Sequence, residues 1–298
     1  MMISILKKIN PVRSFSLFFI LFSFYLLFLA GCYEPVEGCL DLDAINYDVT
    51  ADNACNDCCT YPALTLSMQH LVQWPHDSVS LRYGVLYPVI STPQPADSFL
   101  IERARFFISN LLLLKDDGTQ VHVEEQLELE LANGEKKTIP DNFAKLDRDF
   151  FQPRKLGTIK TEGVVTALKF TLGLEEFLQQ NEIVSGLPDG HPLDTTTDTI
   201  SYRPGEGIAP VLLIVRHDTS LFADSLLFRF TQPLTVTLPL DAPFVIKKGF
   251  DVELTLRTNY MDWVAGADFQ NDSPQTISDK IADNLPNVFS VTEIKLKQ

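Results

Sequence analysis

From residue 63 to the C-terminus the chain alternates between apolar and polar residues, and this period of two restricts its fold more than any other feature. The clearest run begins at Val164 and places Leu168, Phe170, Leu172 and Leu174 on one face. Because successive side chains of a β-strand point to opposite faces, such a run predicts a strand that is buried on one side. Similar runs occupy residues 64–68, 121–131, 226–230, 234–238 and 252–256.

Two further stretches, residues 105–114 and 211–215, are apolar almost throughout, which is typical of strands covered on both faces. Helical patterns are brief and fall at residues 175–180 and 278–284. Many short strands separated by turn residues predict an all-β domain over residues 63–298, a β-sandwich with long loops and a few short helices. With 45% hydrophobic residues, the chain is able to bury a core of this size.

The N-terminal segment has the layout of an export signal. Basic residues precede an apolar run over residues 15–29, and small residues follow it. This order predicts a secretory signal peptide over residues 1–31, and the run is shorter than the roughly 20 residues of a membrane-spanning helix. The ending Leu29-Ala30-Gly31-Cys32 resembles a bacterial lipobox, which implies that Cys32 is acylated and becomes the mature N-terminus. The alternatives are a plain signal peptide, or a membrane anchor with a chance cysteine.

The chain is strongly acidic, with 39 Asp and Glu against 24 Lys and Arg and a net charge of −15. An acidic surface has no electrostatic attraction to nucleic acid or to anionic lipid headgroups, so neither is expected as a partner. The membrane is expected to hold the protein through its lipid alone, with residues 32–38 as a tether. We expect a cell-envelope protein anchored to the outer membrane, on its periplasmic or cell-surface face.

Four cysteines remain once Cys32 is assigned to lipid, and they lie close together in the sequence: Cys39, Cys55, Cys58 and Cys59. An even, clustered set in an exported protein predicts a disulfide framework. A bridge between the adjacent Cys58 and Cys59 would be strained, which leaves two arrangements: 39–58 with 55–59, or 39–59 with 55–58. Zinc binding is the alternative, but the second pair of ligands is missing.

The residues around these cysteines form a recognisable series. It begins at Gly38-Cys39, continues through Ala44-Ile45-Asn46-Tyr47 and ends at Cys58-Cys59-Thr60-Tyr61. In this order they resemble the small cysteine modules of Bacteroidetes surface proteins, which implies a disulfide-linked module over residues 39–62. A calcium loop of the EF-hand type is disfavoured, because Ile45 and Asn46 stand where an oxygen ligand and a glycine are needed.

One segment interrupts the strand pattern and is the first place to expect a binding site. Residues 186–210 contain few apolar residues, and loops longer than about 12–15 residues are uncommon unless they are functional or disordered. His191 with Asp194 would supply a mixed nitrogen and oxygen metal site here, and Tyr202 is an aromatic residue of the same loop. A solvated acidic loop without a ligand is the alternative interpretation.

Several motifs from residue 64 onward follow one another in a distinctive order. They are Arg105-Phe106-Phe107-Ile108-Ser109-Asn110-Leu111, Asp117-Gly118, Lys145-Leu146-Asp147, Leu168-Lys169-Phe170-Thr171-Leu172-Gly173-Leu174, His191-Pro192-Leu193, Asp262-Trp263, Asn284 and Phe289-Ser290-Val291. Together they resemble the MbnP-like family of periplasmic copper-binding proteins, first associated with methanobactin operons. The resemblance implies a β-sandwich able to hold copper and a dihaem cytochrome c peroxidase-like partner.

The sequence departs from that family where its metal chemistry is expected. Tyr202 is the one aromatic residue in place of an aromatic run, and Thr292, Glu293 and Lys295 replace the terminal histidines. One imidazole with carboxylates makes a harder and looser site than several imidazoles. We therefore expect copper binding through His191 to be weak or lost.

Two other classes of function remain open. A cell-surface binding module would recognise peptide or carbohydrate through the loop of residues 186–210. An enzyme is not expected, because the sequence has no nucleophile elbow, no paired-histidine zinc motif and no phosphate-binding glycine loop. His70 and His122 lie in strand-like stretches and are interpreted as ordinary sheet residues.

Overall fold

The computed structural model describes residues 33–89, 97–149, 152–180, 182–194, 200–203, 207–219 and 224–297. The signal peptide over residues 1–31 and Cys32 lie outside the described residues, so export and lipidation stay predictions. The described chain divides into two compact units, one of residues 33–40 and 48–58 and one of residues 41–47 and 59–297. None of its described helices is long and apolar enough to cross a membrane.

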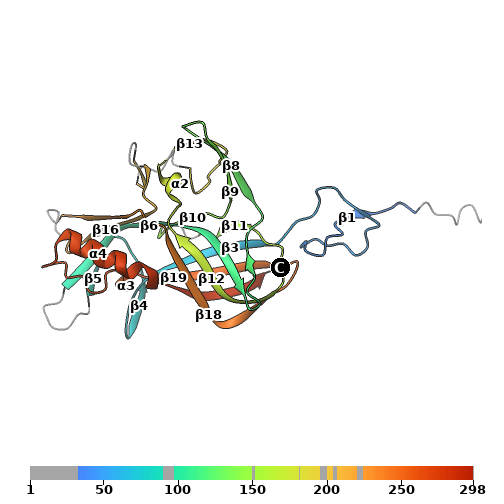
Figure 1. Ribbon diagram of the computed structural model, residues 1–298. Coiled ribbons are helices and arrows are strands. Elements are labelled where there is room, and N and C mark those ends of the chain that lie inside the picture. Colours follow the sequence, from blue (N-terminus) through green and yellow to red (C-terminus); the bar gives the residue numbers. More distant parts are fainter. Residues whose placement is uncertain are drawn as a thin grey trace, which may run out of the picture. The chain divides into compact units, whose positions relative to one another are not determined.

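The larger sheet of the second unit has eight described strands. Its main path is β17-β16-β6-β12-β18 (Figure 1), and three shorter strands pair with β6 in addition. The strands are β5 (Leu86–Val89), β6 (Asp97–Lys115), β7 (Gln120–Val121), β10 (Ala144–Asp147), β12 (Gly163–Leu172), β16 (Val211–Arg216), β17 (Leu226–Phe230) and β18 (Leu234–Ile246).

A five-stranded sheet lies opposite, with the path β11-β3-β19-β20 and β4 paired to β3. Its strands are β3 (Ala63–Trp74), β4 (Asp77–Ser80), β11 (Arg154–Thr158), β19 (Asp251–Asn259) and β20 (Phe289–Lys297). β3 and β19 run parallel, and the other pairs in this sheet are antiparallel. The first unit contributes a parallel pair, β1 (Glu37–Gly38) and β2 (Asn53–Ala54).

The two large sheets share one hydrophobic core, which confirms the predicted β-sandwich. Leu64 and Leu66 of β3 belong to the same cluster as Leu168 and Phe170 of β12, and all four are almost completely buried. Burying a side chain of this size contributes about 1.5–3 kcal/mol relative to leaving it exposed. The alternating residues of the sequence are therefore the inward-facing residues of the two sheets.

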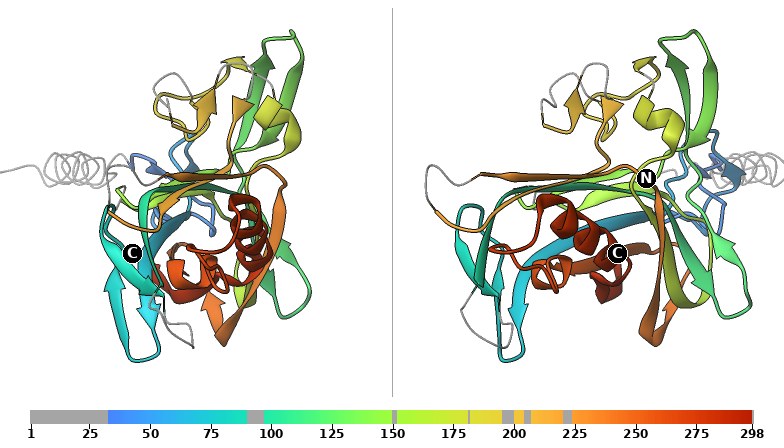
Figure 2. Two further views of the ribbon diagram at one scale, coloured as in Figure 1. Left: turned by 90° about the vertical axis from the view of Figure 1, so that its left-hand side faces the viewer. Right: turned by 60° about the vertical axis from the view of Figure 1, so that its left-hand side comes forward.

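Short helices cover part of this core (Figure 2). They are α3 (Tyr260–Trp263), α4 (Pro274–Asn284) and the 3₁₀ turn η1 (Leu285–Asn287). α4 follows the predicted helical pattern and begins earlier than expected, because the Ser273 side chain caps the amide of Thr276 and Pro274 suits the first helical turn. Ile277 and Ile281 of α4 join the main core.

A second, smaller hydrophobic cluster covers the outer face of β6. Along this strand Phe106 and Ile108 point into the main core, whereas Phe107 belongs to the second cluster. The cover consists of a three-stranded sheet, a helix and a two-stranded pair, which lie together beside the sandwich (Figure 1). They are β8 (Gln126–Leu131), β9 (Lys136–Pro140), β13 (Ile183–Ser185), α2 (Glu176–Gln180), β14 (Tyr202–Arg203) and β15 (Gly207–Ile208). This arrangement explains why β6 is apolar on both faces.

Residues from two of the sequence motifs, Asn110 and the pair Arg105 and Asp147, have structural roles in the large sheet. Asn110 has a φ of 51° and sits where the pairing of β6 with β12 shifts register, so it forms a bulge in the long strand. Asp147 is fully buried, and both Nε and Nη2 of Arg105 lie within 3.0 Å of its Oδ2. Tyr83 donates a hydrogen bond to the other oxygen of the same carboxylate. These motif residues have structural roles in this chain.

Candidate functional site

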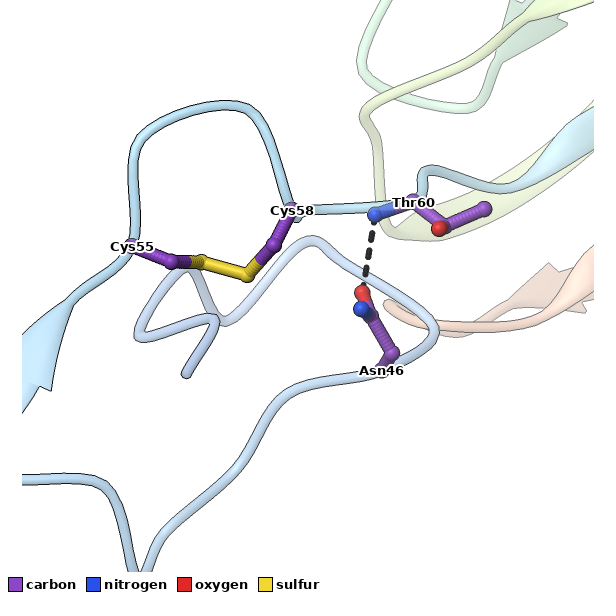
Figure 3. Close-up of a disulfide and its surroundings, with 4 residues drawn as sticks. All are labelled: Asn46, Cys55, Cys58 and Thr60. Carbon is purple, nitrogen blue, oxygen red and sulfur yellow. Dashed lines mark hydrogen bonds between the residues drawn. A yellow bond between two sulfur atoms is a disulfide. The ribbon is translucent and has the colours of Figure 1, made fainter. Parts of the chain in front are cut away.

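The four cysteines of the N-terminal module form two disulfides, which selects one of the two predicted arrangements. Cys55 pairs with Cys58, with 5.8 Å between their Cα atoms (Figure 3), and Cys39 pairs with Cys59. The sulfurs of Cys55, Cys58 and Cys59 lie within 4.8 Å of one another. Because each of them belongs to a disulfide, none is available as a thiolate ligand for zinc or copper.

The segment that follows is fixed by backbone contacts. The Asn46 side chain accepts a hydrogen bond from the Thr60 amide at 2.8 Å (Figure 3), and the Ile45 amide donates to the Thr60 carbonyl. The amide of Asp43 and then the hydroxyl of Tyr61 donate hydrogen bonds to the carboxylate of Asp41, and both lower its pKa. The asparagine and tyrosine of the module motif are thus structural residues, and no calcium ligand role is needed to account for Asp41.

His191 lies in the loop that was expected to hold the metal, and its imidazole is almost completely buried. Its Nδ1 accepts a hydrogen bond from the Leu193 amide at 3.1 Å. Nε2 therefore carries the proton and donates to Oδ1 of Asp141 at 3.0 Å. Because both ring nitrogens are engaged, a metal ion would have to replace one of these hydrogen bonds. His191 does not fit the role of a copper ligand in this arrangement.

The other residues of the loop also pack against the fold. The amide of Asp194 donates to the carbonyl of His191 in a tight turn, and Tyr202 is half-buried in β14 beside the second cluster. Leu193 and Ile208 are buried within that cluster. Although residues 186–210 contain few apolar residues, the part of this segment that the structure describes buries several of them. The described residues of the loop cover part of the outer face of β6.

His70 lies inside the core, between the two sheets. Its Nδ1 is 2.9 Å from the hydroxyl of Tyr260, and the rings of His70 and Tyr260 stack. Nε2 is buried and has no hydrogen-bond partner among the described residues. Burial lowers the pKa of His70 to about 4, so the imidazole is neutral at physiological pH. The strand interpretation of His70 is confirmed, although an unpartnered buried nitrogen is not typical of a sheet histidine.

A groove of about 630 Å³ lies beside Trp74. β4 forms one wall and β5 the other, and these strands pair with β3 and β6 respectively and with no other described strand. A shallower hollow of about 550 Å³ adjoins it and shares Trp74, Asp77 and Pro88. We call the two together the Trp74 groove. Its described lining consists of Trp74, Pro75, His76, Asp77, Val79, Ser80, Arg82, Val85, Leu86, Tyr87 and Pro88.

The walls of the Trp74 groove are held in place by hydrogen bonds. The indole Nε1 of Trp74 donates to the carbonyl oxygen of Pro88 at 3.0 Å, which fixes the half-buried ring across the groove. The hydroxyl of Tyr87 accepts from the amide of Arg82 at 2.8 Å and closes the turn between the two strands. These two hydrogen bonds restrain the ring of Trp74 and the turn between β4 and β5.

The groove combines exposed apolar side chains with the cationic side chain of Arg82. Val79, Val85 and Leu86 are about 40% exposed, at 38%, 41% and 42%. The guanidinium of Arg82 has no hydrogen-bond or ion-pair partner among the described residues, whereas Arg103 and Arg105 are bound to carboxylates. An aromatic face, an apolar wall and a cationic side chain are the elements of a specific binding site.

Sequence reasoning did not single out this groove. Trp74 packs on Tyr87, with ring centroids 6.2 Å apart. The exposure of the other part of the Trp74 ring is set by the positions of β4 and β5, which belong to different sheets. The available signal was the Trp74-Pro75-His76-Asp77 turn, where an aromatic residue stands next to three turn-forming or polar residues.

Comparisons with known proteins do not assign a family to this chain. No protein-family profile matches the sequence, and no curated protein matches it. One similar solved structure is MbnP from Methylosinus trichosporium, which is 11% identical, with a TM-score of 0.35 over 71% of this chain and 78% of that protein. A likeness at this level supports no conclusion about function, and the motif resemblance to the MbnP-like family stays a prediction.

Proposed function

We propose that this protein is an exported, lipid-anchored and non-catalytic binding protein that recognises its ligand in the Trp74 groove. The observation that supports the proposal is the indole of Trp74, which is fixed by Pro88 and faces an open groove of about 630 Å³. Binding pockets of small ligands fall in the same range of volume. The recognition surface therefore differs from residues 186–210, where the sequence placed it.

Arrays of immobilised peptides and oligosaccharides test the proposal. We expect purified protein without its leader to bind a subset of either array, and Trp74→Ala to lose that binding. Val245→Ala is the matched control, because Val245 is 52% exposed and lies outside the groove. Binding that persists in Trp74→Ala, or that is lost equally in Val245→Ala, would show that the groove is not the site.

Copper binding is a second candidate, and one observation favours it. The Nε2 of His70 is buried and has no hydrogen-bond partner among the described residues, and an imidazole nitrogen is a ligand type that copper accepts. One imidazole without further ligands makes a weak site, in agreement with the weak binding expected from the sequence. The dihaem peroxidase-like partner implied by the motif resemblance belongs to this second candidate.

A Cu(I) competition titration against a chromophoric chelator separates the two candidates. We expect weak copper binding that disappears in His70→Phe and persists in His122→Ala, whose histidine is exposed. Tight stoichiometric copper that survives His70→Phe would contradict a site at His70. A complete lack of copper binding would leave ligand recognition in the Trp74 groove as the function.

A further inference from the structure

We infer that the ligand of the Trp74 groove is an extended peptide segment that adds to β4 as a further strand. This inference rests on the proposed function, because it takes the groove as the binding site. It goes beyond that proposal in naming the class of ligand and the mode of recognition. In this mode, main-chain hydrogen bonds to a sheet edge provide affinity, and pockets for alternate side chains provide specificity.

On the side away from β3, the backbone of β4 pairs with no other strand that the structure describes. The amide of Leu81 donates to the carbonyl of His70, so the amide of residue 81 points toward β3. The amide of Ser78 instead donates to the carboxylate of its neighbour Asp77 at 2.8 Å and points away from β3. Because backbone amides alternate along a strand, Ser80 points outward with Ser78. Both outward residues flank Val79, which lines the groove.

The outward amide of Ser78 already donates a hydrogen bond to an acceptor, the side chain of Asp77. In this structure a carboxylate oxygen of Asp77 occupies the position that a peptide carbonyl of an added strand would take. Every residue of β4 is exposed, so an incoming strand does not need to displace other chain segments that the structure describes. The edge is short, and it is suited to a segment of a few residues.

The groove beside this edge supplies the side-chain recognition. Trp74 and Leu86 form an apolar wall on one side, and Val79 and Val85 are exposed next to them. These residues match a large apolar side chain of the ligand. The guanidinium of Arg82, which has no partner in the described part of the chain, matches a carboxylate, since an arginine fork binds carboxylates in a bidentate manner. The predicted ligand is an extended segment with a large apolar residue and an acidic residue.

A peptide accounts for these features better than a carbohydrate. A sugar would use the indole face and polar side chains, and it would leave the outward amides of Ser78 and Ser80 and the aliphatic wall without a role. An extended peptide uses all of them. The spacing of alternate residues along a strand, about 6.6–6.8 Å, also repeats in any segment that pairs with it.

The probe for this inference is a fluorescein-labelled, capped pentapeptide of alternating valine and threonine, with phenylalanine at its centre and a terminal aspartate amide. Its binding to the leaderless protein is measured by fluorescence anisotropy. The backbone amides of an extended peptide form two alternating sets that face opposite edges of the strand. Two further peptides are N-methylated, the first on one set of amides and the second on the other set. Variants Arg82→Gln and Ser80→Pro test the cation and the outward amide, and Val245→Ala is the control.

We expect one of the two methylated peptides to bind about tenfold more weakly and the other to bind within about twofold of the parent, because only one set of amides faces β4. Ser80→Pro and Arg82→Gln should each weaken binding several-fold, and Val245→Ala should not change it. Circular dichroism of Ser80→Pro checks that the sandwich stays folded.

Equal effects of both methylated sets, or no binding of the parent peptide at millimolar concentration, would overturn strand addition. The failure of this inference is distinguishable from failure of the proposed function. An oligosaccharide that binds wild type and not Trp74→Ala would support the groove as a binding site while excluding an added peptide strand. If no peptide or oligosaccharide binds in a way that depends on Trp74, both the proposed function and the inferred strand addition are wrong.

Discussion

The imidazole of His191 donates a hydrogen bond to the carboxylate of Asp141 across 3.0 Å, and this contact gives the histidine of the motif a structural role. The loop around it closes over the second hydrophobic cluster, and Phe143 packs against the ring edge to face. A side chain held in this way contributes to stability whether or not the protein binds a metal.

Replacing His191 by alanine tests that role. We expect His191→Ala to lower the free energy of unfolding by about 1–3 kcal/mol, because Asp141 and the Leu193 amide lose their partners. Copper binding should not change. Urea unfolding and a parallel copper titration measure the two effects, with His122→Ala as an exposed control expected within about 0.5 kcal/mol of wild type. Wild-type stability together with lost copper binding would contradict this prediction.

Acid should destabilise the protein through His70. Burial holds the pKa of His70 at about 4 in the folded protein, against 6.5 for an exposed histidine. Between these values the unfolded chain binds a proton that the folded protein does not, so the free energy of unfolding falls as the pH drops from 6.5 toward 4. The loss amounts to about 3 kcal/mol. Urea unfolding at neutral pH and at about pH 4.5 should show a smaller loss in His70→Gln, and equal losses in both proteins would refute the assignment.

Lipid anchoring is tested at Cys32. The Leu29-Ala30-Gly31-Cys32 ending predicts acylation of this cysteine, so Cys32→Ser should release the protein from the membrane fraction or stall its processing. Fractionation of cells followed by intact mass of the mature protein measures both outcomes. A variant that is processed normally and stays in the membrane at the wild-type level would show that the anchor lies elsewhere.

The disulfides should stabilise the N-terminal module without being required by the sandwich, whose core contains no cysteine. Reduction and alkylation should label four thiols, and mapping of unreduced peptides should recover Cys39–Cys59 and Cys55–Cys58. The melting temperature of the sandwich should stay within a few degrees after reduction. Cooperative unfolding of the whole protein on reduction would contradict the independence of the sandwich core.

The buried carboxylate of Asp147 supplies a further test. Arg105 and Tyr83 both bind it, and removing the carboxylate would take the anionic partner of the buried Arg105 guanidinium away. Asp147→Ala should therefore cost about 3–5 kcal/mol. Chemical unfolding measures the loss, and Asp117→Ala in an exposed turn is the matched control. A cost below about 1 kcal/mol for Asp147→Ala would show that the pair is dispensable.

The strands could be predicted from the sequence because apolar residues alternate with polar residues where one face of a strand is buried. The alternation at Leu168 and Phe170 predicted which residues face the core, and the continuous apolar run of β6 predicted cover on both faces. The run did not reveal what the cover is. The three-stranded sheet and the loop around His191 reach β6 only through tertiary contacts, so a loop that reads as solvated is packed against Phe143.

The candidate site was less predictable for the same reason. The sequence marks Trp74 and Pro88 separately, and the hydrogen bond that turns the indole toward the groove joins residues of two different sheets. The neutral state of His70 likewise depends on burial opposite Tyr260 rather than on its neighbours in sequence. Both properties depend on contacts between residues that are distant in the sequence, so no local sequence pattern predicts them.

The bond between Cys39 and Cys59 has a consequence for how long the protein remains at the cell. For a chain anchored at Cys32, a protease that cuts between residues 40 and 58 would normally shed everything downstream. Here the two cut ends stay covalently joined through Cys39 and Cys59, so a nicked protein is retained. Release by such a cut requires reduction as well, and the exposed stretch nearest the anchor thereby tolerates proteolysis without loss of the bound domain.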